Sequence, residues 1–425
     1  MKHQFFTLDN GLRVILIDTG TFPTLSALLL VGAGSRYENE KNNGIAHFFE
    51  HMAFKGSKKY PNSLILASTI EGLGGVFNAF TTKDHTGYWI KATVEHFDTV
   101  IDVLADMILN PILSEEEIDR EKGVIVQEIN MYEDMPQSQV GELFENLIYK
   151  GNPLGFDVIG RKDTVVTFNR KTFTDYMRNL YHPKNAVLVI AGGLKENGNY
   201  LEIIKDKFGG WQQGKKAVFK IVKKVQKTPQ NLIKHKKTEQ THFVLGFRAF
   251  SLFDPGKYTL SLLATLLGGG ASSRLFIEVR ERRGLAYYIS TSTSLYQDTG
   301  SISTQAGVGN NLENLREAIT VTLDEHRNIA KGRITQDEFV RAKEMVKGRL
   351  LLALEDSYRL ASFLGTPALL EDKIETPDEV IRKLNAVKLE EVVDLADKLF
   401  KPKNLNFSLI GPFEKSKDFD RILSI

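Results

Sequence analysis

The chain repeats one pattern at a spacing of about 220 residues, and this repeat constrains the fold more than any other feature. Residues 181–192 read as an aromatic residue, a Pro-Lys-Asn turn, an apolar strand and a glycine, and residues 400–411 repeat this order 219 positions later. A second match joins Ser114 to Thr335 at a spacing of 221, and each precedes an acidic first helical turn and an apolar stripe. Two similar spacings indicate two domains of one fold.

The repeat also predicts where the domains end. We expect a first domain over residues 1–212, a linker over residues 213–230 and a second domain over residues 231–425. The predicted linker contains a run of lysines, which is more typical of a solvated surface than of a binding patch. A chain of 425 residues is also too long for one ordinary hydrophobic core.

Strand and helix patterns in the first half are segregated rather than strictly alternating. Residues 13–17 and 25–31 predict strands joined by a turn, and residues 76–82 and 86–93 predict a hairpin. Helices are predicted over residues 42–54, with Asn42 or Asn43 as the N-cap, over residues 96–109 and over residues 115–134. This arrangement predicts an α+β fold.

Composition argues against several classes of function. Lys and Arg number 55 against 53 Asp and Glu, so the net charge of +2 gives no reason to expect nucleic acid as a partner. No cysteine is present, which excludes disulfides and thiolate ligands, so any metal must be held by nitrogen and oxygen. Apolar runs are too short to span a membrane, and residues 1–11 read as a strand rather than a signal peptide. A cytoplasmic enzyme is the expectation.

Residues 47–51 read His-Phe-Phe-Glu-His, and this run predicts a metal site. Positions four apart on a helix lie on one face, so His47 and His51 can reach one ion, with Glu50 close enough to contact a water there. A catalytic zinc normally has three protein ligands and one open position. A third ligand must therefore come from another part of the chain.

The predicted helix over residues 115–134 offers candidates for that ligand. Glu121 and Glu128 are two helical turns apart and face the same way. Glu128 lies in an apolar stretch, where a carboxylate is costly unless it is paired or bound to a metal. From the residues alone, Glu128 is as consistent with a paired helical acid as with a ligand.

The second copy of the repeat lacks all of these groups. It has Ala342 in place of Glu121 and Arg349 in place of Glu128. The stretch that corresponds to the His-Phe-Phe-Glu-His run has three apolar residues in place of its histidines and its glutamate, namely Leu260, Leu263 and Ala264. A purely structural role would predict acids in both copies, so the asymmetry indicates metal chemistry in the first half only.

With these motifs the sequence resembles the M16 metallopeptidases, or inverzincins, over essentially the whole chain. The family pattern is H-x-x-E-H, then 76 residues, then E, and here 76 residues separate His51 from Glu128. The resemblance implies that His47, His51 and Glu128 bind one zinc ion per chain and that Glu50 is the general base. It implies that Glu121 orients the site without binding the metal.

The resemblance extends to two segments outside the metal motif. The residues Phe77, Asn78, Ala79 and Thr81 resemble the family's edge strand, which pairs with the substrate backbone. The segment Arg280-Glu281-Arg282-Arg283-Gly284-Leu285-Ala286-Tyr287 resembles the family's R-x-x-x-G-L-A-Y segment. The resemblance implies that Arg280 and Tyr287 act at the active site, although, taken alone, Arg280 is more typical of a surface ion pair and Tyr287 of a core aromatic residue.

For the whole chain, the resemblance implies two homologous domains that form half of a clamshell, each a mostly antiparallel sheet with helices packed on it. It implies a zinc endopeptidase that hydrolyses unfolded or short peptides in an enclosed chamber. A homodimer is expected, with neither nucleic acid nor membrane as a partner. The alternatives are a non-catalytic scaffold or binding subunit of the same family and a catalytic subunit that needs a different partner chain.

Overall fold

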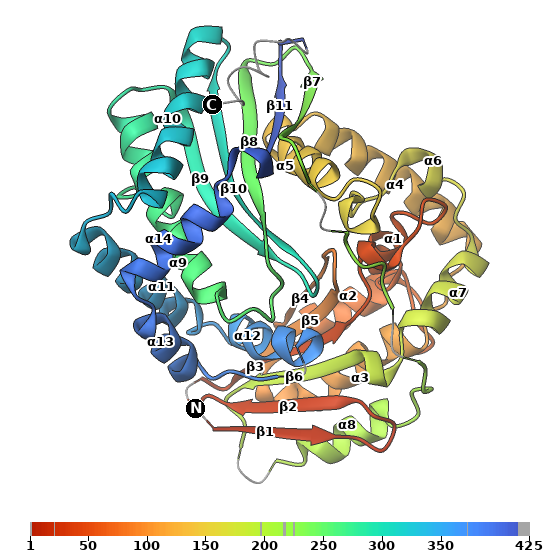
Figure 1. The fold of residues 1–425 in the computed structure, drawn as a ribbon. Helices are drawn as coiled ribbons and strands as arrows, with labels where there is room; N and C mark the ends of the chain where they lie inside the picture. The colour runs from red at the N-terminus through yellow and green to blue at the C-terminus, as the bar shows by residue number, and fades with distance from the viewer. Residues whose placement is uncertain are drawn as a thin grey trace. The chain divides into compact units, whose positions relative to one another are not determined.

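The computed structural model describes residues 2–20, 22–195, 198–215, 218–223, 226–371 and 373–414. The chain forms two compact units, each built around one sheet (Figure 1). Unit 1 comprises Met1–Asn130, Phe156–Lys220 and Leu352–Thr376, and unit 2 comprises Met131–Gly155, Ile221–Leu351 and Pro377–Ile425. Among the described residues, no helix is long and apolar enough to cross a membrane.

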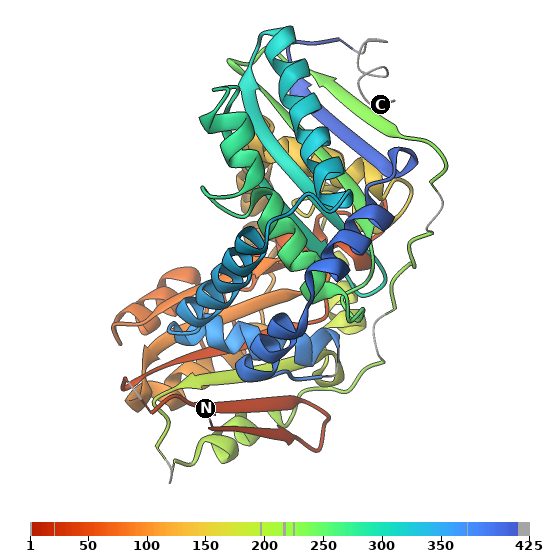
Figure 2. The ribbon, with the colours of Figure 1, turned by 60° about the vertical axis from the view of Figure 1, so that its left-hand side comes forward.

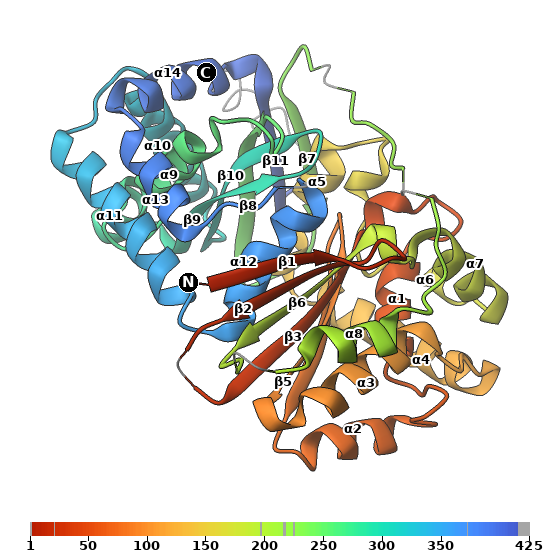
Figure 3. The ribbon, with the colours of Figure 1, turned by 90° about the horizontal axis from the view of Figure 1, so that it is seen from below.

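Unit 1 contains a six-stranded sheet, which Figure 3 shows with its strands side by side. In spatial order the strands are β1 (Lys2–Thr7), β2 (Arg13–Asp18), β6 (Ala186–Gly192), β3 (Thr24–Val31), β5 (Thr86–Thr93) and β4 (Val76–Thr81). The β2–β6 pair is parallel, and the other pairs are antiparallel. Every residue of β6 is buried, because helices cover both faces of the sheet at its centre.

The larger core of unit 1 lies between one face of the sheet and most of its helices. The helices of unit 1 on that side are α1 (Ile45–Met52), α2 (Ser63–Glu71), α3 (Phe97–Leu109), α4 (Glu115–Glu133), α6 (Lys162–Val165), α7 (Arg170–Leu180) and α8 (Tyr200–Phe208). The opposite face packs on α12 (Ser357–Leu370), whose leucines meet the alternate apolar side chains of β2, β3 and β6.

Unit 2 contains a five-stranded sheet with the order β7 (Gln230–His235), β11 (Leu405–Gly411), β8 (Gln240–Ala249), β10 (Gly300–Gly309) and β9 (Ala286–Leu295). Only the β7–β11 pair is parallel. The main core is formed with α9 (Lys257–Gly268), a π-helical turn η5 (Phe276–Glu281), α10 (Leu312–Ala330), α11 (Gln336–Ala353), α13 (Pro377–Ala386) and α14 (Leu389–Leu399). Figure 2 turns α9, α10 and α14 toward the viewer. The other face packs on α5 (Pro136–Ile148).

The compact units exchange one helix between the two halves of the sequence. Helix α5 comes from the first half but packs on β8 and β11, whereas α12 comes from the second half and packs on β3 and β6. The two helices begin 221 residues apart, which is the spacing of the repeat. The homologous halves predicted at residues 1–212 and 231–425 stay a prediction, and part of the predicted linker, at residues 216–217 and 224–225, lies outside the described residues.

Most elements predicted in the first half are confirmed. The hairpin is β4 and β5, with Thr81 opposite Thr86, and the helices at residues 96–109 and 115–134 are α3 and α4. The strands at residues 13–17 and 25–31 are β2 and β3, but β6 lies between them, so the turn that joins them does not form a hairpin. The two Pro-Lys-Asn turns each precede a fully buried strand, which confirms that part of the repeat.

The predicted start of α1 was wrong, because neither asparagine acts as the N-cap. The cap is Gly44, with φ at 97°, and the helix begins at Ile45. The Asn42 side chain accepts a hydrogen bond from the Asn39 amide, and the Asn43 side chain donates to Glu38 and to the Asp157 carbonyl, so both are occupied elsewhere. Glycine suits position 44, because φ is positive there and a Cβ would lie 2.8 Å from the Cα of Gly160.

Candidate metal centre

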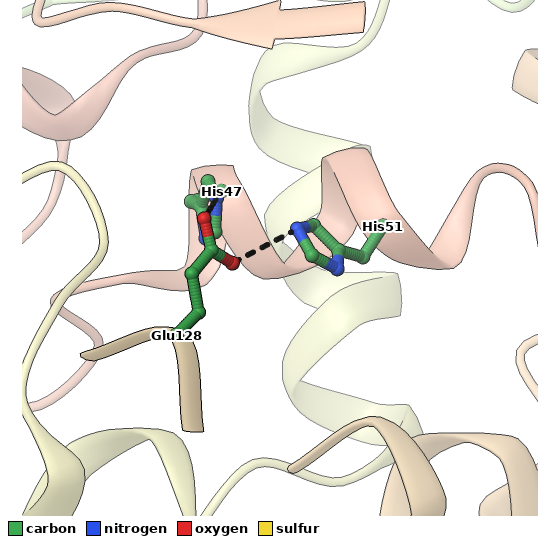
Figure 4. A group of neighbouring side chains, drawn as sticks. All are labelled: His47, His51 and Glu128. Carbon is green, nitrogen blue, oxygen red and sulfur yellow. Dashed lines mark ion pairs between the residues drawn. The ribbon is translucent and has the colours of Figure 1, made fainter. Parts of the chain in front are cut away.

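Two helices of unit 1 bring the three predicted ligands together (Figure 4). His47 and His51 lie four positions apart on α1, and Glu128 faces them from α4. The Nε2 atom of His47 is 3.7 Å from Oε1 of Glu128, and Nε2 of His51 is 3.5 Å from Oε2 of the same carboxylate. One ligand atom from each residue lies within 4.8 Å of the others.

This donor set fits a zinc ion. Zinc takes imidazole nitrogen and carboxylate oxygen at distances that place neighbouring ligand atoms of a tetrahedron about 3.3–3.4 Å apart. The observed separations of 3.5 and 3.7 Å are close to this value. Burial lowers the pKa of His47 to about 3, with the neighbouring His51 adding to the effect, so the imidazole is neutral and its lone pair is available to a cation.

Glu121 links one histidine to a lysine that the sequence did not single out. Its Oε1 atom is 2.8 Å from Nδ1 of His51, and its Oε2 atom is 2.5 Å from Nζ of Lys55. Glu121 is only 2% exposed. Burial acts to raise the pKa of this carboxyl, but the hydrogen bonds from His51 and Lys55 outweigh burial and lower it. The ionised carboxylate holds the Nδ1 proton of His51 and leaves Nε2 free to face Glu128.

Glu50 lies on the same helix and is held from the sheet. The hydroxyl of Thr81, the last residue of β4, donates a hydrogen bond to Oε2 of Glu50 at 2.6 Å. Burial raises the pKa of Glu50, and the Thr81 hydrogen bond only partly offsets this. A carboxylate whose pKa is shifted toward neutrality is better matched to proton transfer at physiological pH than an exposed one.

Strand β4 lies at the edge of the unit 1 sheet. Within the described part of the chain it pairs with β5 on one side only. Phe77 packs its ring 5.4 Å from that of Phe54, while the Asn78 side chain accepts a hydrogen bond from the Ala79 amide. All four residues assigned to substrate binding therefore lie on this edge strand, and Thr81 also contacts Glu50.

Arg280 and Tyr287 belong to unit 2, whereas the predicted metal ligands belong to unit 1. Arg280 lies in the π-helical turn η5 and Tyr287 is the second residue of β9, with the guanidinium 5.8 Å from the tyrosine ring. Tyr287 is 72% exposed, so it is not a core residue. Its neighbour Tyr288 takes the inward position and makes a 3.0 Å hydrogen bond with His242.

Comparison with known proteins supports the assignment that this geometry suggests. Residues 13–162 match the model of the insulinase (peptidase family M16) domain, and residues 167–346 match that of the peptidase M16 inactive domain. These matches, together with the histidine–carboxylate group, indicate that the protein is of the metalloprotease class. The chain belongs to peptidase family M16.

Individual relatives cover nearly the whole chain. The zinc protease YmxG of Bacillus subtilis is 36% identical over 408 residues, which are 96% of this chain and 98% of that protein. A zinc protease of Rickettsia felis is 32% identical over 97% of this chain and 98% of its own length. A protease from Helicobacter pylori has the same fold, with a TM-score of 0.90 at 24% identity over 97% of this chain and 99% of that one.

Sequence reasoning missed three contacts around the metal ligands. These are the Lys55 ion pair, the Thr81 bond to Glu50, and the bonds from the start of α1 to Glu38. Lys55 lies three positions past Met52, the last residue of α1, so helical spacing did not single it out. The Thr81 bond joins positions 31 residues apart, and the Glu38 bonds depend on the course of the loop before α1, so neither follows a helical or strand spacing.

Proposed function

We propose that this chain is a zinc-dependent endopeptidase that hydrolyses unfolded or short peptides, with one zinc ion per chain. The observation that carries the proposal is the position of Glu50. This carboxylate lies one residue before a ligand on the metal helix and is held by a hydroxyl from the adjacent sheet edge. A purely structural metal site has no use for a further, partly buried carboxylate beside its ligands.

The three ligand side chains would hold zinc, and Glu50 would move the proton. Bound zinc supplies Lewis acidity, which polarises a carbonyl and lowers the pKa of a water. Glu50 accepts a proton from the attacking water and returns it to the leaving amine. Thr81 keeps the carboxylate directed, and Glu121 keeps the His51 ring in the orientation that presents Nε2.

The open edge of β4 supports an extended peptide as substrate. Unpaired backbone groups at a sheet edge can hydrogen-bond to an added strand, and such pairing depends little on side chains. Phe77, Asn78 and Ala79 would supply these contacts. Folded proteins would be poor substrates, because their backbone is already paired.

Arg280 and Tyr287 complete the proposal on the strength of the family resemblance. Tyr287 would donate a hydrogen bond to the oxyanion that develops in the transition state, and Arg280 would hold the substrate. Both side chains are accessible, at 72% for Tyr287 and 40% for the Arg280 side chain. We further propose a cytoplasmic homodimer whose closed chamber admits chains that can thread into it.

The test is cleavage of a quenched, unstructured peptide by the purified full chain and by the Glu50→Gln variant at equal zinc content. The variant keeps the size of the side chain but cannot accept the proton. We expect the rate to fall by about 10²–10⁴-fold, the usual contribution of a general base. A disulfide-locked, folded protein of similar sequence content serves as the control substrate and should resist cleavage.

Two results would contradict the proposal. If the zinc-loaded wild type cleaves no peptide, the chain is not a self-sufficient peptidase and a scaffold role or a missing partner gains support. If Glu50→Gln cleaves as fast as the wild type, another group moves the proton.

A further inference from the structure

The metal helix α1 is short and has no side-chain cap of its own. It runs for only 8 residues, and its N-cap is Gly44, which has no side chain to accept from the first turn. The first amide groups of any helix lack intrahelical partners and need acceptors from elsewhere. An uncapped helix of two turns frays easily, and this helix carries two of the three metal ligands.

A buried carboxylate from the preceding loop supplies the missing acceptors. Oε1 of Glu38 accepts the amide of Ala46 at 2.9 Å, and Oε2 accepts the amide of Gly44 at 2.8 Å. Oε2 also accepts the side-chain amide of Asn43 at 2.9 Å. All three partners are donors, so only a group with two acceptor oxygens satisfies them.

This arrangement is costly. Glu38 is 3% exposed, and burial raises the pKa of its carboxyl to about 7 although the three hydrogen bonds and Lys83 act to lower it. An apolar residue at a buried loop position would avoid this desolvation. The position of the carboxylate offsets part of this cost, because its negative charge faces the positive end of the helix that holds His47.

The start of α1 is also clamped from the other side. The Asn43 side chain donates to the Asp157 carbonyl, and the hydroxyl of Thr164 donates to the Asn43 carbonyl at 2.8 Å. The corresponding helix of unit 2, α9, has a simpler entry, where Asp254 accepts the amide of Gly256 two residues later. The elaborate anchor thus occurs on the helix that binds metal, and the local one on the helix that does not.

We propose that Glu38 is a positioning residue for the metal centre: by fixing the first turn of α1, it sets where His47 meets Glu128 and so sets the zinc affinity. Glu38 contacts no ligand, and it acts through the backbone of Gly44 and Ala46. The inference rests on the zinc site of the proposed function but not on peptide cleavage.

The test compares zinc dissociation constants, measured by chelator competition, for the wild type and the Glu38→Gln variant of the full chain. Glutamine has the same shape, but its amide group must face one of the helix amides as a donor. We expect zinc affinity to fall by about 10-fold, the lower end of what loss of a supporting contact costs a metal site. The absorption bands of the cobalt-substituted protein should shift as well, because the ligand geometry changes.

A matched control removes a cap from a helix that carries no ligand. Asn169 caps α7 by accepting the amide of Thr172, and Asn169→Ala should lower the Tm without changing zinc affinity or the cobalt spectrum. A purely structural role for Glu38 predicts that both variants lose Tm and neither loses affinity. Should Glu38→Gln not fold, Glu38→Asp keeps two acceptor oxygens but draws them back by one methylene, and it should also weaken zinc binding.

The outcomes separate the inference from the proposed site. Wild-type zinc affinity in every folded Glu38 variant would overturn the role of Glu38 and leave the zinc site intact. Equal losses of affinity in the Glu38 and Asn169 variants would also overturn it. A wild-type chain that binds no zinc would overturn the metal site itself, and the inference with it.

Discussion

Helices α1 and α4 of unit 1 and helices α9 and α11 of unit 2 hold corresponding positions in the repeat, but their facing side chains differ. In unit 1 the carboxylate of Glu128 faces the histidine pair of α1. In unit 2 the corresponding Arg349 donates a 2.6 Å hydrogen bond to the carbonyl of Gly269, the residue that caps the C-terminus of α9. A cation there complements the negative end of a helix, so the same helix pair is held by packing and capping instead of by ligands.

The difference shows how little of the fold the chemistry requires. Leu260 and Leu263 are fully buried in the core of unit 2 at the positions of His47 and Glu50. Unit 1 instead keeps carboxylates whose pKa values are raised by burial, at Glu50 and Glu128. Such groups lower stability, and proteins retain them where activity needs them.

The largest expected effect is a difference in zinc affinity between variants at two corresponding positions, one in each unit. Glu128→Gln removes a ligand charge, and we expect zinc affinity to fall by more than the roughly 100-fold that loss of an outer contact costs. Arg349→Gln should leave zinc affinity unchanged and cost about 1 kcal/mol of stability through the lost hydrogen bond. Zinc dissociation constants and urea unfolding of both variants would measure the contrast. An equal loss of zinc affinity in the two variants would contradict this difference between the units.

Much of this contrast could be predicted from the sequence, because it depends on spacing. The four-residue separation of His47 and His51 places both on one helical face, and the missing groups in the second copy are visible by alignment of the repeat. The exchange of α5 and α12 was not predicted, since an apolar helix face does not indicate which of two sheets it covers. The bonds of Glu38 to the start of α1 and of Thr81 to Glu50 could not be predicted either, because the first depends on the course of a loop and the second joins positions 31 residues apart, and neither follows a helical or strand period.

A buried histidine away from the metal site in each unit should make stability sensitive to acid. His85 in unit 1 and His326 in unit 2 are both buried, and burial lowers the pKa of each from 6.5 to about 4. Between pH 6.5 and about pH 4 these histidines are protonated in the unfolded chain but neutral in the folded protein. Stability is therefore lost as the pH falls from 6.5 toward 4. Each histidine should cost about 2 kcal/mol between pH 7 and pH 5.

The variant His326→Phe tests this in unit 2, since it keeps an aromatic ring between Phe247 and Phe400 and cannot titrate. Urea unfolding of the metal-free protein should show a smaller loss between pH 7 and pH 5 than the wild type shows. An unchanged pH dependence would mean that His326 does not carry the cost.

A buried ion pair beside the predicted ligands should affect zinc affinity, whereas a surface ion pair on another helix should not. Lys55 pairs with the buried Glu121, and Lys55→Met should weaken zinc binding about 10-fold by loosening the carboxylate that orients His51. Lys347 forms a similar pair with Glu344 on α11, where Glu344 is largely exposed. Lys347→Met should change neither zinc affinity nor Tm noticeably, because surface pairs contribute little. Zinc binding that tolerates the loss of Lys55 would remove it from the metal centre.

The smallest expected effect concerns the hydroxyl that holds Glu50. Thr81→Val keeps the shape of the side chain but removes the 2.6 Å hydrogen bond, and we expect kcat to fall about 10-fold, which corresponds to roughly 1.4 kcal/mol. KM and zinc content should stay near the wild-type values. Thr81→Ser restores the hydroxyl and should restore most of the rate. A slow serine variant would show that the methyl group, rather than the hydroxyl, matters.

Anomalous diffraction at the zinc edge from crystals of the zinc-loaded full chain would locate the metal directly. We expect one strong peak per chain, within bonding distance of His47, His51 and Glu128, and none between α9 and α11. A peak at the unit 2 position, or none near the three ligands, would contradict the claim that metal chemistry belongs to the first half of the repeat alone.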